Sequence, residues 1–144
     1  IIDIEKDFPT LTYNKIARHQ SKLVRTRVAS VNSPWLLKCS VGNIHTVAIS
    51  HGEGRFVCDE QLLYKLKQNG QIATQYVDLN DKPTMDIQYN PNGSDWAVEG
   101  IFSPDGRVFG KMGHSERIGK YLYKNINQDT DNHMFESAVE YFKI

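Results

Sequence analysis

The chain has 144 residues, of which 40% are hydrophobic and 24% charged, so it is long enough for one compact folded domain and too short for two ordinary ones. Seventeen Lys and Arg residues balance seventeen Asp and Glu residues, and a net charge of zero argues against nucleic acid as the main partner. The two cysteines are too few for a disulfide scaffold, and no apolar run reaches the ~18 residues that span a bilayer, so we expect a cytoplasmic protein without a membrane partner.

Two strands and a short turn are predicted in the first third of the chain. Period-2 alternation over 22–29 predicts a strand in which Arg25 and Arg27 share one face. Without interleaved aromatic residues, this face is expected to be solvated or to form a domain interface rather than an RNA site. Residues 33–37 predict a turn or a single helical turn, and the apolar run 45–50 predicts a second strand.

A helix and a third strand are predicted next. Asp59 is a favourable N-cap for a helix that continues through Lys67, with three leucines on one face. Asn69-Gly70 is expected to end this helix. A strand over 72–77 and a turn at 80–83 follow.

In the second half of the chain, the sequence predicts a hairpin followed by helical segments. A strand around 96–102 leads into the turn at 103–106, and the strands that flank this turn predict a hairpin near residues 98–112. Beyond 113–117 the chain is expected to become helical, ending in an amphipathic helix from about 132 to 142.

Three loops that follow predicted strands concentrate glycine and polar residues. They are His51-Gly52-Glu53-Gly54-Arg55, Asn90-Pro91-Asn92-Gly93-Ser94 and Gly113-His114-Ser115-Glu116-Arg117. Ligands of α/β proteins tend to bind at the carboxyl ends of strands. The sequence therefore predicts a site built from these loops.

His114 and Glu116 are the most informative pair in these loops. In an extended segment, residues two apart project from one face, roughly 6.5 Å apart along the strand. The glutamate can then accept a hydrogen bond from the imidazole, fix its tautomer and stabilise its protonated form, as the third member of a catalytic triad does. The alternative is an ordinary surface His and Glu at a strand end.

The glycine-rich segment from His51 to Arg55 permits several interpretations. Its glycine spacing fits neither a P-loop nor a dinucleotide-binding fingerprint, and a tight turn is the simpler alternative. A metal-dependent hydrolase would require His51, Glu53 and His114 to converge.

Neither cysteine fits a nucleophile elbow. Such an elbow needs small residues on both sides so that a strained turn exposes the sulfur. Cys39 stands between Leu37 and Val41, and Cys58 between Phe56 and Glu60. Both cysteines are therefore predicted to pack in the interior.

Taken together and in this order, the motifs resemble those of one family, the glutaminase domain of phosphoribosylformylglycinamidine synthase, a class I glutamine amidotransferase. The motifs that carry the resemblance are the loops 51–55 and 90–94, Asp105-Gly106-Arg107-Val108 and His114-Ser115-Glu116-Arg117. The segments 25–36 and 135–142 are also similar to the longer, clostridial-type members. The resemblance covers nearly the whole chain.

The resemblance implies a fold and a parent enzyme. It implies an α/β fold, the later portion of a class I glutamine amidotransferase-like (flavodoxin-like) three-layer sandwich, with residues 1–144 as a single partial glutaminase domain. The parent would be a C–N ligase of purine biosynthesis whose glutaminase releases ammonia for an ATP-dependent synthetase domain. In that family the Gly-x-Cys elbow lies just upstream of the part matching 1–14. We therefore expect the fragment to lack the nucleophile and to be inactive alone.

The same resemblance assigns roles to individual residues. It makes His114 the general base and acid and Glu116 its orienting partner. The residues expected to line the glutamine pocket or the face toward the synthetase are His51, Glu53, Arg55, Asn90, Asn92 and Gly93. No metal or cofactor is expected in this fragment, whereas the parent synthetase domain would use ATP and Mg. Ser115 stands where many relatives have proline, and we expect little damage from this difference.

The expected partners are glutamine and the synthetase domain of the parent enzyme. Self-association of the truncated domain is a further hypothesis, because loss of the early strands would uncover a sheet edge or an apolar face. The alternative function is a non-catalytic binding or scaffold module that uses the same loops.

Overall fold

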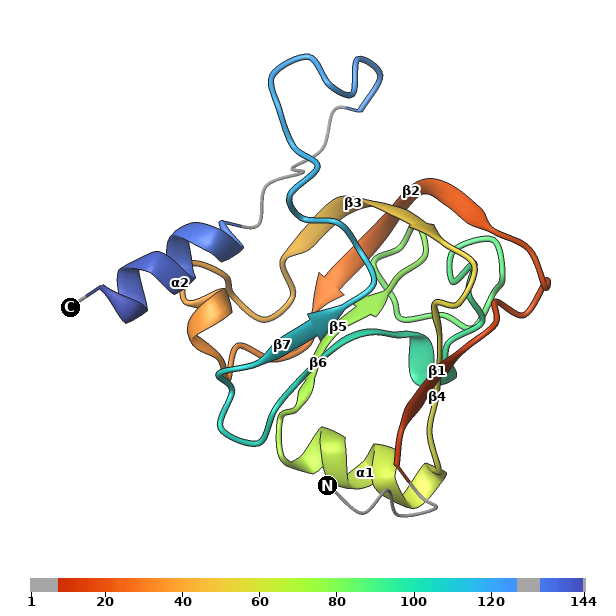
Figure 1. Cartoon of the computed structure of the whole chain (residues 1–144), viewed down its shortest axis with the longest axis horizontal. Coiled ribbons are helices and arrows are strands. Elements are labelled where there is room, and N and C mark those ends of the chain that lie inside the picture. The colour runs from red at the N-terminus through yellow and green to blue at the C-terminus, as the bar shows by residue number, and fades with distance from the viewer. Residues whose placement is uncertain (1–7, 127–132, 144) are drawn as a thin grey trace.

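The computed structural model describes residues 8–126 and 133–143. In this part the chain forms a curved antiparallel sheet, a small two-stranded sheet and two α-helices (Figure 1). The strands are β1 (Thr10–Thr12), β2 (Gln20–Val28), β3 (Ile44–His51), β4 (Arg55–Val57), β5 (Ile72–Tyr76), β6 (Val98–Phe102) and β7 (Phe109–Lys111). The helices are α1 (Glu60–Gln68) and α2 (Met134–Phe142), and the 3-10 turns are η1 (Pro34–Leu36) and η2 (Asp95–Ala97). Neither described helix is long and apolar enough to cross a bilayer.

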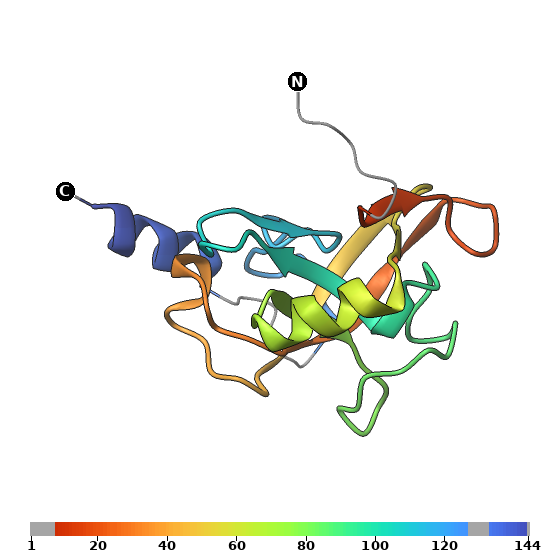
Figure 2. The same cartoon turned by 90° about the horizontal axis from the view of Figure 1, so that it is seen from below.

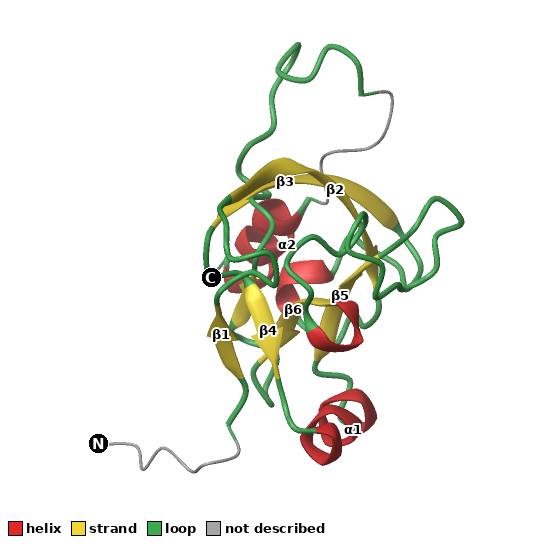
Figure 3. Cartoon of the chain, turned by 90° about the vertical axis from the view of Figure 1, so that its right-hand side faces the viewer, coloured by secondary structure: helices red, strands yellow, loops and turns green. Residues whose placement is uncertain are grey.

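The larger sheet has the strand order β3-β2-β5-β6-β7, and β1 pairs with β4 in the smaller one. The edge strands of the larger sheet are β3 and β7. An antiparallel bridge between Ala48 and His114 connects β3 to the segment that follows β7. In Figure 3, β2 and β3 arch over β5 and β6. The sheet therefore curls until its two edges meet near His114.

The long strand β2 confirms the period-2 prediction. Val24, Thr26 and Val28 are buried, and the intervening Arg25 and Arg27 are half-buried on the opposite face. The guanidinium of Arg25 pairs with Asp81 and donates to a backbone carbonyl of the turn that follows β5. This face is thus used by a turn of the same chain.

Helix α1 begins and ends as predicted. The side chain of Asp59 accepts hydrogen bonds from the backbone N–H groups of Gln61 (2.8 Å) and Leu62 (3.4 Å). The helix stops at Asn69, and Gly70 has a φ of +66°, the left-handed conformation that ends many helices. The buried leucines of α1 pack on Phe56, Ile72 and Val98.

The predicted C-terminal helix is confirmed as α2, although Asn132 lies outside the described residues. Helix α2 packs against η1, and Ser137 on it accepts a hydrogen bond from the backbone N–H of Lys38 (3.2 Å). In Figure 2, α1 lies across the strands and α2 lies beyond the end of the sheet.

Two parts of the chain differ from the sequence prediction. Residues 118–126 form turns and bends rather than a helix, since Tyr121 has a φ of +69° and Leu122 closes a turn onto Gly119. The strand expected from Trp96 starts only at Val98.

Residues 95–97 form η2 because two side chains hold them. Asp95 accepts from the backbone N–H of Cys58 (3.1 Å), and Gln75 donates to the carbonyl of Trp96 (2.7 Å). Trp96 consequently has a φ of +48°, which no strand accommodates. The predicted hairpin is confirmed as β6 and β7.

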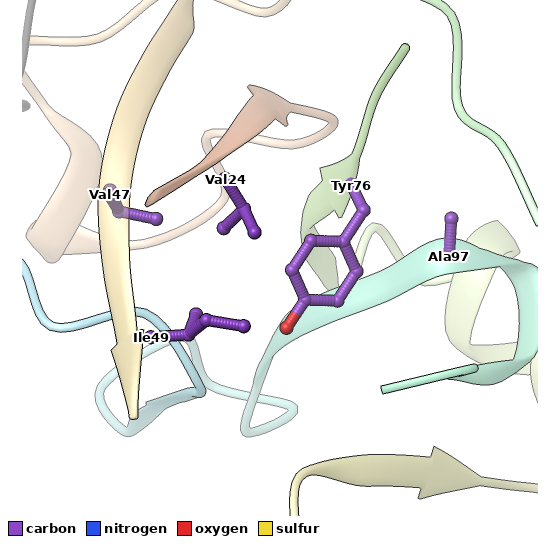
Figure 4. Packing of buried hydrophobic residues seen from close by; sticks show 5 residues of the cluster. All are labelled: Val24, Val47, Ile49, Tyr76 and Ala97. Atoms are coloured by element: carbon purple, nitrogen blue, oxygen red, sulfur yellow. The ribbon is translucent and has the colours of Figure 1, made fainter. Parts of the chain in front are cut away.

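The core beneath the arch of the sheet consists of residues from four elements. Val24, Val47, Ile49 and Ala97 surround the ring of Tyr76 (Figure 4). Tyr76 has no exposed surface, and its hydroxyl accepts a hydrogen bond from Asn92 (2.7 Å). The apolar core thus reaches one of the predicted site loops.

Candidate active site

His114 lies where the chain returns from β7 to β3. Its backbone N–H donates to the carbonyl of Ala48 (2.8 Å). The preceding residue must be small, because a Cβ at Gly113 would lie 2.6 Å from Cγ2 of Val47 and 2.9 Å from Oε1 of Glu99. A glycine therefore lets the segment approach β3 closely enough to place His114 at the closure of the sheet.

The imidazole of His114 and the carboxylate of Glu116 are in direct contact. Nδ1 of His114 lies 2.6 Å from Oε1 of Glu116, with side-chain exposures of 30% and 56%. The structure thus brings together the two residues whose spacing predicted this contact. Within the described chain, Nε2 of His114 has no hydrogen-bond partner, so this nitrogen is available to take a proton from a reacting group.

The surroundings of Glu116 favour its charged form. Partial desolvation raises the pKa of this carboxyl, but its own backbone N–H, the hydrogen bond with His114 and the charges of His114 and Arg117 together bring the pKa below its ordinary value. Arg117 contributes from 3.9 Å. A charged Glu116 holds a proton on Nδ1 and leaves Nε2 as the basic nitrogen.

His51, at the end of β3, lies near His114. Burial lowers the pKa of His51, and the charges of His114 and His19 lower it further. Its Nε2 is 3.5 Å from the side-chain nitrogen of Asn92, and its buried Nδ1 has no partner among the described residues. The direction of this shift favours the neutral imidazole of His51.

The loops 51–55 and 90–94 pack against each other. Nε of Arg55 donates to the carbonyl of Gly93 (3.2 Å), and Ser94 Oγ accepts from the backbone N–H of Phe56 (3.1 Å). Glu53 is exposed. Two of the three loops thus form one unit, and His51 within it is near enough to His114 for the charge of His114 to lower its pKa.

Asn90 and Asn92 are fully buried and shape this unit from within. The side chain of Asn90 both donates to the carbonyl of Ser94 (2.8 Å) and accepts from its N–H (3.0 Å). Gly93 has a φ of +74°, and a Cβ there would lie 2.8 Å from Cβ of Lys15. The amide group of Asn90 is thus engaged within the protein, whereas Asn92 donates to the hydroxyl of Tyr76 and its buried Oδ1 has no partner among the described residues.

Two residues that organise the site were not predicted. Asn14 is buried and ties the first loop together: its side chain donates to the carbonyl of His51 (2.8 Å) and accepts from the N–H of Gly54 (3.1 Å). Glu99 is buried on β6 and accepts from the N–H of Gly113 (2.5 Å). Only Glu99 had a sequence signal, as the one charged residue in the otherwise apolar run Val98–Phe102.

Cys39 and Cys58 pack in two different apolar clusters, as predicted, and His114 belongs to neither. Burial and the nearby Asp59 and Asp95 raise the pKa of the Cys58 thiol, which disfavours the nucleophilic thiolate. In the two described stretches of chain, no three His, Cys, Asp or Glu side chains group as metal ligands, so the convergence that a metal-dependent hydrolase would require is not found.

A mostly apolar cavity of about 290 Å³ lies apart from the loops. It is bordered by β1, β4, β6 and β7 and includes Leu11, Phe56, Glu99 and Lys111 in its lining, but neither His114 nor Glu116. This cavity is therefore not the site that His114 and Glu116 define.

Comparisons with known proteins identify the family of the chain. The family described as "CobB/CobQ-like glutamine amidotransferase domain" matches residues 2–142. Phosphoribosylformylglycinamidine synthase subunit PurQ of Methanosarcina barkeri is 34% identical over 131 residues, which are 91% of this chain and 54% of the relative. The PurQ subunit of Thermomicrobium roseum is 38% identical over 94 residues, 65% of this chain and 39% of the relative.

A solved structure of PurLQS from Thermotoga maritima matches 99% of this chain and 56% of that chain, with a TM-score of 0.70 and 25% identity. The predicted fold, part of a class I glutamine amidotransferase-like domain, is thereby confirmed. The chain spans about half the length of the curated relatives it matches. It belongs to the CobB/CobQ-like glutamine amidotransferase domain family, and its resemblance to the glutaminase of phosphoribosylformylglycinamidine synthase is confirmed.

Proposed function

We propose that this chain supplies the base and the orienting acid of a glutaminase that serves phosphoribosylformylglycinamidine synthesis. The observation that carries this proposal is the 2.6 Å contact between His114 and Glu116, in a chain of the glutamine amidotransferase family. His114 would accept the proton of a cysteine nucleophile through Nε2 and return it to the departing ammonia. Glu116 would hold the imidazole in the required tautomer.

The nucleophile in this proposal lies outside the 144 residues. Cys39 and Cys58 pack in clusters that do not include His114, and the raised pKa of Cys58 opposes thiolate formation. Without a thiolate there is no thioester intermediate, and positioning by the other residues cannot replace it.

The unit formed by loops 51–55 and 90–94 would shape one wall of the glutamine site. Asn90 would act by fixing its loop, since its amide is engaged internally, and Asn92 would tie the same loop to Tyr76 through its side-chain N–H group. His51, Glu53, Arg55 and Gly93 would face glutamine or the synthetase. Within this group Glu53 is exposed, His51 and Arg55 are half-buried, and Gly93 is buried.

The partner in this proposal is the synthetase of the same cytoplasmic pathway, which would consume ATP with Mg and take up the ammonia. The names of the relatives and the three-component name of the solved structure support it. A non-catalytic scaffold is the second candidate, and the absence of a suitable thiol in the described chain is the observation that favours it.

The test is glutamine hydrolysis by the purified 144-residue chain, with His114→Ala, Cys39→Ser and Cys58→Ser as matched variants. We expect no ammonia above background from any of them. Ammonia release that disappears in His114→Ala and in one cysteine variant would show that the nucleophile lies in this chain and would overturn that part of the proposal.

A further inference from the structure

Glu99 is a carboxylate enclosed by the curved sheet. Its side chain has no exposed surface. Thr74 donates a hydrogen bond to one carboxylate oxygen, and the backbone N–H of Gly113 donates to the other (2.5 Å). Because a buried carboxylate without such donors is costly, these contacts account for a charged residue within an apolar strand.

Lys111 extends this arrangement to the other side of His114. Its Nζ lies 3.8 Å from Oε1 of Glu99 and donates to the hydroxyl of Ser115 (2.8 Å), while only 8% of its side chain is exposed. A buried ammonium needs a compensating charge, and Glu99 supplies it. Ser115 is thus engaged by a side chain from β7.

Three consecutive residues are held by three different strands. Gly113 is held by Glu99 on β6, His114 by the carbonyl of Ala48 on β3, and Ser115 by Lys111 on β7. With both neighbours of His114 fixed, the Cα–Cβ direction of His114 is fixed as well. Its imidazole is therefore already placed to contact Glu116, and no change of backbone conformation is needed.

We propose that Glu99 and Lys111 are positioning residues that hold His114 where its imidazole contacts Glu116. They do not touch the imidazole and act through Gly113 and Ser115. This inference rests on the proposed function of His114 as the glutaminase base, and it adds a buried ion pair that keeps that base oriented.

The experiment follows the ring nitrogens of His114 by NMR in the ¹⁵N-histidine-labelled chain. In the wild type we expect Nδ1 to carry the proton and its Hδ1 signal to be protected from exchange with water by the contact with Glu116. Glu99→Gln leaves the Lys111 charge unpaired, and Lys111→Met leaves the carboxylate unpaired. Each is expected to abolish the protected Hδ1 signal, and the neutral double variant is expected to recover part of it.

Ile72→Val is the matched control, because it loosens a core cluster under α1 whose members include no residue of the 113–116 segment. It should leave the His114 signals unchanged. If Glu99→Gln does not fold, Ser115→Ala removes only the hydroxyl that Lys111 binds and is expected to weaken the same signal. Unchanged His114 signals in the folded variants, or an equal loss in Ile72→Val, would overturn the proposal.

Glu116→Ala, which removes the acceptor of the His114 contact, separates this inference from the proposed function. If it leaves the His114 signals unchanged, the pair on which the proposed function rests does not exist in solution. If it abolishes the protected signal while the Glu99, Lys111 and Ser115 variants do not, the pair stands and only the positioning role is wrong.

Discussion

A histidine becomes an effective base when something fixes which of its nitrogens carries the proton. In this chain Glu116 does so from 2.6 Å, and Nε2 of His114 has no hydrogen-bond partner among the described residues. The two-residue spacing allowed this contact to be predicted from the sequence. Glu99 could not be assigned a role in the same way, because its contact with Gly113 exists only once the sheet has curled.

Replacing Glu116 by glutamine should change the pH dependence of stability. Folding lowers the pKa of Glu116 from its ordinary value of 4.5, so its stabilisation is present above pH 4.5 and is lost as the pH falls through the folded pKa. Since the side chain is more than half exposed, the gain is under about 1 kcal/mol. Urea unfolding should show wild type more stable than Glu116→Gln at pH 6 and equal to it in strong acid. An unchanged difference across this range would contradict the assignment.

His51 predicts a loss of stability in acid of the same sign as Glu116, but beginning at a higher pH. Burial and neighbouring charge lower its pKa below the ordinary 6.5, so the unfolded chain binds a proton at a higher pH than the folded one does. Stability should therefore decrease as the pH falls from 6.5 toward the folded pKa. His51→Gln should lose less stability than wild type between pH 7.5 and pH 5.5 in urea unfolding. Parallel losses in the two proteins would show that His51 is not held neutral.

At the scale of elements, the site depends on how loops and strand edges meet. Local patterns predicted β2, β3 and α1, since alternation and capping act within a few residues. They could not predict η2, where Asp95 and Gln75 impose a turn on residues with strand preference. They also gave no sign of Asn14, whose partners His51 and Gly54 lie about forty positions away in the sequence.

Adding a methyl group at Gly113 should disturb the closure of the sheet. The new Cβ would overlap Val47 and Glu99, so we expect Gly113→Ala to cost about 1–3 kcal/mol of unfolding free energy. Gly110→Ala is the matched control on β7, because nothing lies within 4 Å of its Cβ position. Thermal unfolding of both variants measures the difference between their losses of stability. Equal losses would mean that the approach of residue 113 to β3 is not tight.

The cap of α1 offers an independent check of the fold. Asp59→Ala removes the acceptor for two backbone N–H groups and should cost about 1 kcal/mol. Asp59→Asn keeps an acceptor and should cost much less. Denaturant midpoints of the two variants measure the difference, and a similar loss in both would show that charge, rather than capping, stabilises this end of the helix.

At the scale of the whole molecule, the described chain leaves much apolar surface exposed. Phe135 and Val139 on α2 and Leu11 and Tyr13 near β1 are each close to half exposed or more. Such surface favours association. We therefore expect the isolated chain to self-associate, with a mass by light scattering that rises with concentration. A constant monomer mass at high concentration would count against this.

The central claim is that His114 and Glu116 serve a nucleophile carried outside these 144 residues. The most direct measurement is ammonia release from glutamine by a fusion of this chain to the part of the Methanosarcina barkeri subunit that lies outside the match. We predict activity that falls by about 10³-fold or more in His114→Ala and also falls in Glu116→Gln. A folded fusion without activity, or with activity that His114→Ala leaves intact, would contradict the account.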